Sequence, residues 1–404
     1  AKQGRTMSDG FRTPGRPDDM ATFPGPDGRI ILVCNHELDI NQVAYSPFPG
    51  KEYPADLDRG LSHDAGTPGK PSDADPTAHQ PYLGGTSTLV YNPATGTTEK
   101  HFLSLTGTDR NCSGGATPWG SWITCEEPEQ LTSERGRRHG YCFEVSADPD
   151  SGLQKAVALK GLGRCRHEAV SYDPNDRSLY LTEDRNDGLL YRFVPEKERD
   201  FTKGQLYALA LKDRKSADLR NYDPEQKQVA ENAVLEVEWI EIEDPDPPKD
   251  DLRISGHQAG AARFARGEGI FFSDGAHYIC CTDGGPTRQG QIYRLLPDHF
   301  GKGRPGLELF LQPTESDLLS NGDNICAAPN GDLIICEDLV GDHKTRKSPH
   351  LRGVTPEGQI YNLARNAKDK TEFAGSCFSP DGSILFVNVQ MHGLTVAITG
   401  PWRA

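Results

Sequence analysis

The chain has 404 residues and carries 59 acidic against 44 basic side chains, which gives a formal net charge of −15. An acidic balance argues against nucleic-acid binding, because phosphate backbones require a positively charged surface, and it favours cations as ligands. The longest apolar run that we find, Leu206–Leu211, is far shorter than the roughly 20 residues that span a bilayer. We therefore expect no nucleic-acid partner and no membrane span.

A strand-rich unit recurs along the chain. In each copy an apolar strand ends on an acid or an amide, a loop follows, and a glycine opens the next strand. The strands that open these pairs are predicted at 30–34, 122–125, 179–182, 278–282, 333–336 and 384–389. Turns such as Asp274-Gly275 and Asn330-Gly331 precede most of them, and such turns are typical of β-hairpins. Units of this kind, repeated about every 60 residues, are typical of propeller blades.

Six copies predict an all-β fold, a six-bladed β-propeller, and an irregular β-sandwich is the competing interpretation. We expect one propeller domain over residues 1–404, with insertions near 38–80 and 196–260 that form outer strands and surface loops. The 43 glycines and 30 prolines agree with many turns. No fourth strand is evident after 395–398, so the N-terminal segment is expected to complete the last blade.

Acidic residues directly precede the strands that should line the central channel. Four carboxylates and one thiol occupy this same position in different repeat units: Cys112, Glu168, Glu268, Asp323 and Glu372. Converging carboxylates repel one another, and burying them without partners is costly. Cations would neutralise such a cluster. Carboxylate oxygens suit Ca²⁺, and a thiolate adds a softer ligand that favours a transition metal. The alternative is that these acids only cap strands.

Two further side chains belong near this cluster. Arg266 lies two residues before Glu268, so both side chains point the same way in an extended segment. Its guanidinium is either a salt-bridge strut or a fork for an anionic ligand, and beside metal ions we favour the anion. Asn111, next to Cys112, either contacts substrate or only shapes the turn. The other cysteines form no C-x-x-C pair and are interpreted as structural thiols.

Several segments together resemble the PhoX family of bacterial alkaline phosphatases. They are Asn111-Cys112-Ser113-Gly114-Gly115, Thr117-Pro118-Trp119-Gly120, Cys125-Glu126-Glu127, Arg164 with His167-Glu168, Arg266-Gly267-Glu268, Glu372-Phe373-Ala374-Gly375, Ser379-Pro380-Asp381-Gly382 and Gly400-Pro401-Trp402. The likeness extends from about Asn35 to Trp402. It implies a six-bladed propeller that hydrolyses phosphomonoesters and is exported to the periplasm or secreted.

The resemblance also implies cofactors and roles. The family site holds two ferric ions and three calcium ions around a bridging oxo group. Carried over, Cys112, Glu168 and Glu268 become iron ligands, and the two carboxylates also reach calcium. Asp323 and Glu372 become calcium ligands, Arg266 the phosphate clamp, and Glu37 a weaker candidate for the metal shell.

We therefore expect a metal-dependent phosphatase that acts, as a monomer, on small phosphate esters. Two alternatives remain open. One is a calcium-dependent lactonase or phosphotriesterase on the same fold, which would need neither Arg266 nor Cys112. The other is a propeller that binds a partner or calcium without catalysis.

Overall fold

The computed structural model describes residues 1–49, 52–67, 80–131, 137–225, 229–314, 318–338 and 348–402. In these ranges the regular secondary structure is almost entirely β-strand, which confirms the all-β prediction. The described residues contain one α-helix, α1 (Leu252–Ala259), and the short 3-10 turns η1 (Pro26–Gly28), η2 (Val43–Tyr45), η3 (Arg59–Leu61) and η4 (Lys160–Leu162). None of the described helices is long and apolar enough to cross a membrane.

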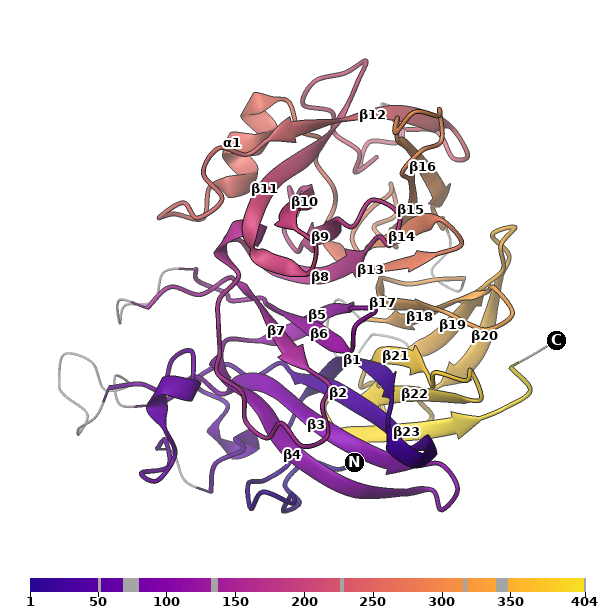
Figure 1. Cartoon of the computed structure of the whole chain (residues 1–404). Helices are drawn as coiled ribbons and strands as arrows, with labels where there is room; N and C mark the ends of the chain where they lie inside the picture. Colours follow the sequence, from indigo (N-terminus) through magenta and orange to yellow (C-terminus); the bar gives the residue numbers. More distant parts are fainter. Residues whose placement is uncertain are drawn as a thin grey trace.

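The strands form antiparallel sheets whose members follow one another in the chain (Figure 1). The N-terminal sheet contains β1 (Pro17–Pro24), β2 (Ile30–His36), β3 (Gly84–Asn92) and β4 (Thr97–Thr108), and the next contains β5 (Asn111–Ala116), β6 (Ser121–Glu126) and β7 (Cys142–Ser146). The two C-terminal sheets contain β17 (Gly322–Ala327), β18 (Leu333–Glu337), β19 (His350–Val354) and β20 (Ile360–Arg365), then β21 (Phe373–Phe378), β22 (Ile384–Val389) and β23 (Leu394–Thr399).

The middle of the chain forms a larger, continuous sheet. It joins β8 (His167–Tyr172), β9 (Leu179–Glu183), β10 (Leu190–Lys197), β11 (Asp200–Leu211) and β12 (Val234–Glu241) to β13 (Gly267–Ser273), β14 (Ala276–Cys281), β15 (Gln291–Leu296) and β16 (Gly306–Leu311). Strand β12 pairs with β11 on one side and with β16 on the other. Residues of the insertion expected near 196–260 thus bridge two consecutive groups of strands. The segment expected near 38–80 contains η2 and η3, and its residues 50–51 and 68–79 lie outside the described ranges.

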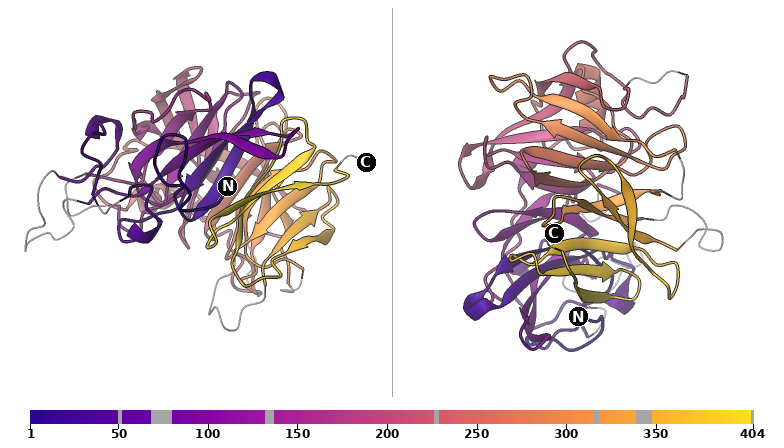
Figure 2. Two further views of the ribbon diagram at one scale, coloured as in Figure 1. Left: turned by 90° about the horizontal axis from the view of Figure 1, so that it is seen from below. Right: turned by 90° about the vertical axis from the view of Figure 1, so that its right-hand side faces the viewer.

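The first strands of successive groups contact one another in a closed circuit. The order is β1, β5, β8, β13, β17, β21 and back to β1. In Figures 1 and 2 the indigo N-terminal strands accordingly lie beside the yellow C-terminal ones. The N-terminal residues also close the ring at its outer side, because Ala1 exchanges backbone hydrogen bonds with Thr395 of β23 and the N–H of Gln3 donates to the carbonyl oxygen of Gly393. This agrees with the expectation that the N-terminal segment completes the last group of strands.

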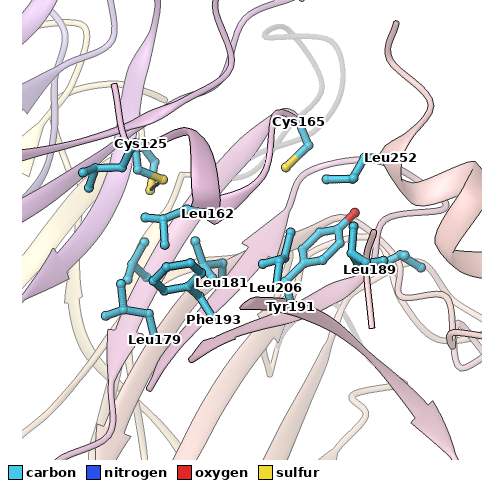
Figure 3. Close-up of a cluster of buried hydrophobic side chains, with 14 of the residues drawn as sticks. Cys125, Leu162, Cys165, Leu179, Leu181, Leu189, Tyr191, Phe193, Leu206 and Leu252 are labelled. Carbon is cyan, nitrogen blue, oxygen red and sulfur yellow. Dashed lines mark hydrogen bonds between the residues drawn. The ribbon is translucent and has the colours of Figure 1, made fainter. Parts of the chain in front are cut away.

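Apolar residues fill the spaces between neighbouring groups of strands. Figure 3 shows one such cluster, where leucines of β9 and β11 pack with Phe193 and Tyr191 of β10 and with Leu252 of α1. Buried thiols, among them Cys125 and Cys165, belong to the same cluster (Figure 3). The cysteines here act as small apolar side chains, as the sequence indicated.

Close contact between inner strands leads to a first prediction. A Cβ atom on Gly115 of β5 would lie 2.0 Å from the carbonyl oxygen of Val170 in β8. Because backbone cannot yield as a side-chain end can, Gly115→Ala should destabilise the protein by at least about 3 kcal/mol. Gly60→Ala is the control, since its nearest neighbour is a side-chain oxygen of Asp58 at 3.1 Å. Chemical denaturation of both variants measures the difference, and equal stabilities would contradict this packing.

Candidate metal centre

Acidic or thiol side chains occupy the same position in five of the inner strands. They stand at the second residue of β1, β5, β8, β13 and β17, and they are Asp18, Cys112, Glu168, Glu268 and Asp323. The sequence predicted that these ligands precede the strands, whereas each of them is the second residue of its strand. Each of these residues is buried except Asp323, which is half-buried.

A β-bulge in each strand explains how these side chains are aimed. The pairing with the second strand of the group slips by one residue between Pro17 and Met20, Asn111 and Gly114, His167 and Val170, Gly267 and Ile270, and Gly322 and Ile325. A bulged residue has no partner directly opposite, and bulges commonly re-aim a side chain near an active site. Each candidate ligand lies inside such a bulge, so the same backbone distortion turns all of them toward the axis.

The residue just before each of these strands is an arginine or an asparagine. Three of the arginines and the asparagine have positive φ angles: Arg16 (43°), Arg110 (51°), Arg266 (52°) and Asn321 (53°). Non-glycine residues adopt this conformation at an energetic cost and only where the surroundings enforce it. The carbonyl oxygen of each of these residues accepts a backbone hydrogen bond. The donor is the backbone N–H of the residue that follows the second strand, as in Asp338 to Asn321 at 2.9 Å.

These arginines alternate with acids that follow the second strands, and together they form a belt of ion pairs. The pairs are Arg16–Glu37 (3.0 Å), Glu37–Arg110 (2.5 Å), Arg110–Glu127 (3.0 Å), Glu127–Arg166, Arg166–Asp184 (3.3 Å) and Asp184–Arg266 (2.6 Å). We call these seven residues the arginine–acid belt. It follows the circuit from β1 to β13 and holds positive charge directly beside the candidate ligands.

Two sets of candidate ligand atoms lie close enough together to bind metal ions. One set comes from Cys112, Glu127 and Glu168, and the other from Glu168, Glu268 and Asp323; in each set the ligand atoms lie within 4.8 Å of one another. Glu168 belongs to both sets. A carboxylate shared by two sets is suited to bridge neighbouring ions, and the thiol sits in only one of the sets.

The electrostatics indicate that this cluster lacks positive charge. Burial raises the pKa of Glu168 well above its ordinary range, and the neighbouring Glu268 and Glu127 raise it further. Burial and Asp184 raise the pKa of Glu268, and burial with Glu168 does the same for the thiol of Cys112. Metal cations bound by these atoms would supply the missing charge, so the donor set and its electrostatics both fit a metal centre.

The other predicted residues lie in different parts of the site. Glu372 stands one residue before β21, not inside it, and burial, Asp338, Glu37 and Asp18 raise its pKa. Glu37 is a member of the belt, where Arg110 and Arg16 outweigh burial and lower its pKa. Both carboxylates therefore face the same group of charges as the strand residues.

Asn111 has a structural role in the fold. Its side chain is fully buried, donates to Thr124 Oγ1 at 2.8 Å and accepts from Thr108 Oγ1 at 2.5 Å. This is the turn-shaping role that the sequence left open, and a contact of Asn111 with substrate stays a prediction.

Arg266 forms the contacts that the strut interpretation requires, and its binding of phosphate stays a prediction. Its Nε and Nη2 donate to the two carboxylate oxygens of Asp184 at 2.6 and 2.9 Å, and Nη2 lies 3.0 Å from Glu268. The pKa of its guanidinium is raised, because Glu268 and Asp184 outweigh burial. The side chain is a quarter exposed, and no protein partner is found for Nη1 among the described residues.

Sequence reasoning missed Asp18 and most of the belt, namely Arg16, Arg110, Glu127, Arg166 and Asp184. The signal was present in the spacing. Arg16-Pro17-Asp18, Arg110-Asn111-Cys112 and Arg166-His167-Glu168 repeat the Arg266-Gly267-Glu268 pattern. Likewise, the acid that recurs after the second strand of each group served to identify the repeat, but its charge was not considered as part of the site.

Comparison with known proteins identifies the family. The family model described as "Alkaline phosphatase PhoX" matches residues 3–393. The chain belongs to the PhoX alkaline phosphatase family. Among solved structures it resembles Pseudomonas fluorescens PhoX in complex with vanadate, a transition state analogue, with a TM-score of 0.64 and 19% identity over 95% of this chain and 85% of the other. No curated protein matches the chain.

Weaker structural similarity extends to gluconolactonases. That of Pseudomonas aeruginosa, which is periplasmic, has a TM-score of 0.44 and 15% identity, with 95% of this chain and 81% of the other covered. That of Xanthomonas campestris has a TM-score of 0.43 and 10% identity, with 99% and 94% covered. As a PhoX family member the protein is a phosphomonoesterase, and the family implies the metal dependence that the buried ligand groups fit.

Removal of the metal ions should make stability depend on pH in a defined direction. Despite Arg166 and Arg110, burial together with Asp184 raises the pKa of Glu127 to about 8, and the pKa values of Glu168 and Glu268 are raised as well. The metal-free folded state therefore binds more protons than the unfolded chain. Its stability should be greatest near the ordinary carboxylate pKa of about 4 and should fall as pH rises through the raised values.

The measurement is the thermal midpoint of chelator-treated protein from about pH 5 to about pH 9. The midpoint should fall across this window, and re-added calcium and iron should flatten the profile. A metal-free protein whose thermal midpoint rises with pH would contradict the excess of buried negative charge in the cluster.

Proposed function

We propose that the protein hydrolyses phosphate monoesters at a multinuclear iron and calcium centre, with Arg266 binding the phosphate. The observation that carries the proposal is that Glu168 belongs to two adjacent buried ligand sets, of which one contains the thiol of Cys112. We further propose that the closed circuit of inner strands is the wall of a six-bladed propeller and that the centre lies at the mouth of its channel.

The residues divide between the two metals by their chemistry. Cys112, Glu127 and Glu168 combine a soft thiolate with carboxylates, a set that favours a transition metal, and the family resemblance makes that metal iron, with Glu268 as a further iron ligand. Glu268, Asp323 and Glu372 offer only oxygen and suit calcium. Glu37 and Asp18 lie beside the second group and are further candidates. By family resemblance the full set is two iron ions and three calcium ions with a bridging oxo group.

Arg266 can act as strut and clamp together. Asp184 fixes the plane of the guanidinium through two hydrogen bonds. The remaining Nη1 is left to donate to a phosphoryl oxygen of a substrate beside Glu268. A guanidinium held in this way is preorganised, so it loses little conformational freedom when the anion arrives.

The protein contributes orientation and charge to the reaction. When bound, the metal ions supply Lewis-acid polarisation of the phosphoryl oxygens. Arg266 orients the phosphoryl group and balances charge that develops on its non-bridging oxygens during in-line displacement. The belt holds Arg266 in place and lowers the pKa of Asp184 beside the centre, while Arg110 and Arg16 lower the pKa of Glu37 at its other end.

The alternative hydrolases receive less support. A lactonase or phosphotriesterase would give no role to Cys112 or to the guanidinium of Arg266. A propeller that only binds a partner would leave the buried carboxylates of the cluster without neutralising cations. We also propose that the enzyme acts as a monomer in the periplasm or outside the cell, which follows from the family resemblance. Turnover of p-nitrophenyl phosphate with and without chelator tests catalysis and metal dependence together.

Iron bound by a thiolate should give the protein a visible charge-transfer band. Cys112→Ser should abolish this band and lower the iron content, because the soft ligand is lost. Cys280→Ser is the matched control, since that buried thiol lies in β14 outside both ligand sets. Absorption spectra and elemental analysis decide. Colourless wild-type protein, free of iron and fully active, would remove iron from the proposal.

Arg266→Ala should leave the metals bound and reduce activity about 100-fold or more, because a preorganised donor to the transferring group is lost. Inorganic phosphate should inhibit the variant more weakly. Arg266→Lys should recover little, because an ammonium cannot form the fork to Asp184. Metal content, thermal midpoint and phosphate inhibition are the readouts. Loss of metal with unchanged phosphate affinity per active molecule would make Arg266 a strut only.

Asp184→Asn tests whether Arg266 is held by its partner. The amide keeps the shape but loses charge, so KM for substrate and the inhibition constant of phosphate should rise about 10-fold. Asp176→Asn is the control, because Asp176 pairs with Arg192 at 2.9 Å and also accepts from Tyr180 in the same group of strands. Equal effects of the two substitutions on KM would show that Asp184 has no specific positioning role.

A further inference from the structure

A second group of metal-ligating side chains lies outside the centre described above. One ligand atom from each of His63, Glu126 and His139 lies within 4.8 Å of the others, and all three residues are buried. The rings of the two histidines meet edge to face, with centroids 5.0 Å apart. His139 Nδ1 and Glu126 Oε1 are 2.7 Å apart. Two imidazoles and a carboxylate are a common ligand set for zinc.

The surroundings of these residues match the outer contacts of bound metal ligands. His63 Nε2 lies 3.0 Å from the carbonyl oxygen of Arg138, so a proton on that nitrogen leaves Nδ1 as an acceptor. His139 Nε2 is buried without a hydrogen-bond partner and faces a carboxylate oxygen of Asp64 at 3.8 Å. Metal-binding histidines usually turn their second ring nitrogen toward a carbonyl or carboxylate in this way.

Glu126 is fixed by the backbone. Its Oε2 accepts hydrogen bonds from the N–H groups of Gly140 (2.8 Å) and Tyr141 (3.1 Å), and its Oε1 accepts from the N–H of Asp109 (2.9 Å). Oε1 is therefore the oxygen that a metal ion would share with His139. The side-chain Oδ1 of Asp109 is also buried without a partner, but it lies outside this set of mutually close ligand atoms.

The cluster connects the first insertion to the ring. His63 and Asp64 come from the segment after η3, Asp109 from the turn between β4 and β5, Glu126 from the end of β6, and His139 from the approach to β7. The described part of the first insertion contains none of the predicted ligands, and Glu37 directly precedes it.

We propose that His63, Glu126 and His139 bind a structural zinc ion that fastens the first insertion to the β5–β7 sheet. Zinc is favoured over calcium because two of the ligands are imidazole nitrogens. The site is closed, as expected for a structural ion: His139 and Glu126 have no exposed surface, and His63 is 8% exposed. The competing occupant is a proton, shared in the His139–Glu126 hydrogen bond.

The test uses the full-length protein loaded with iron and calcium, equilibrated with Zn²⁺ and freed of loose metal. Elemental analysis should find one zinc per chain. Zinc-edge X-ray absorption should find nitrogen and oxygen ligands at about 2.0–2.1 Å and no sulfur at about 2.3 Å. The sulfur criterion is decisive because the other centre contains Cys112. Zinc with a sulfur ligand, or no bound zinc, overturns the proposal.

Substitutions of two buried histidines provide a second test of the proposal. His63→Ala should lose the zinc and lower the thermal midpoint, with iron and calcium unchanged. His277→Ala is the matched control, because His277 is equally buried and its contacts are Ser171 at 3.0 Å and Asp173 at 3.5 Å. Zinc retained by folded His63→Ala protein, or lost equally from both variants, overturns the assignment. If His63→Ala does not fold, the absorption spectrum of the unsubstituted protein decides alone.

Discussion

The convergence of like charges on the axis of the ring is the constraint on which the rest of the structure depends. Five inner strands each deliver an acid or thiol to one place, and desolvation alone makes such a group of ionised side chains unfavourable. The arginine–acid belt answers part of this problem, since Arg110, Arg166 and Arg266 each join acids of neighbouring groups of strands. The arginines of the belt therefore neutralise the acids and, through the same ion pairs, link neighbouring groups of strands.

The belt is open over the last part of the circuit, and the opening has a chemical consequence. The position before β17 holds Asn321 instead of an arginine, and Thr282 and Gln390 stand where acids follow the second strands elsewhere. Among the described residues no ion pair joins Asp323, Asp338 or Glu372 to an arginine of the belt, and Arg266 and Arg16 act on Asp338 and Glu372 only through space. Carboxylates without paired cationic side chains favour bound metal ions, which supports the proposal of calcium in this half and of iron beside Cys112.

The sequence predicted the repeat, the all-β fold and a cluster drawn from several groups of strands, because strand patterns and recurring acids are local signals. It placed the ligands before the strands instead of inside them, since a β-bulge shifts a side chain without leaving a pattern in composition. Asp18 was missed because β1 precedes the first turn that was recognised. The pairing of Arg266 with Asp184 could not be predicted from the sequence either. The two residues are 82 positions apart in the chain, and only the closed circuit of strands brings them together.

The end of β6 shows how one strand can serve two sites. Glu126 and Glu127 are neighbours, and successive side chains of an extended strand point to opposite sides. Glu127 turns inward to Arg110 and Arg166, whereas Glu126 turns outward to His139 and the N–H groups of Gly140 and Tyr141. Whatever fixes Glu126 thereby fixes the backbone that carries Glu127. A zinc ion bound by Glu126, His139 and His63 would therefore couple the described part of the first insertion to the metal centre through a single peptide unit.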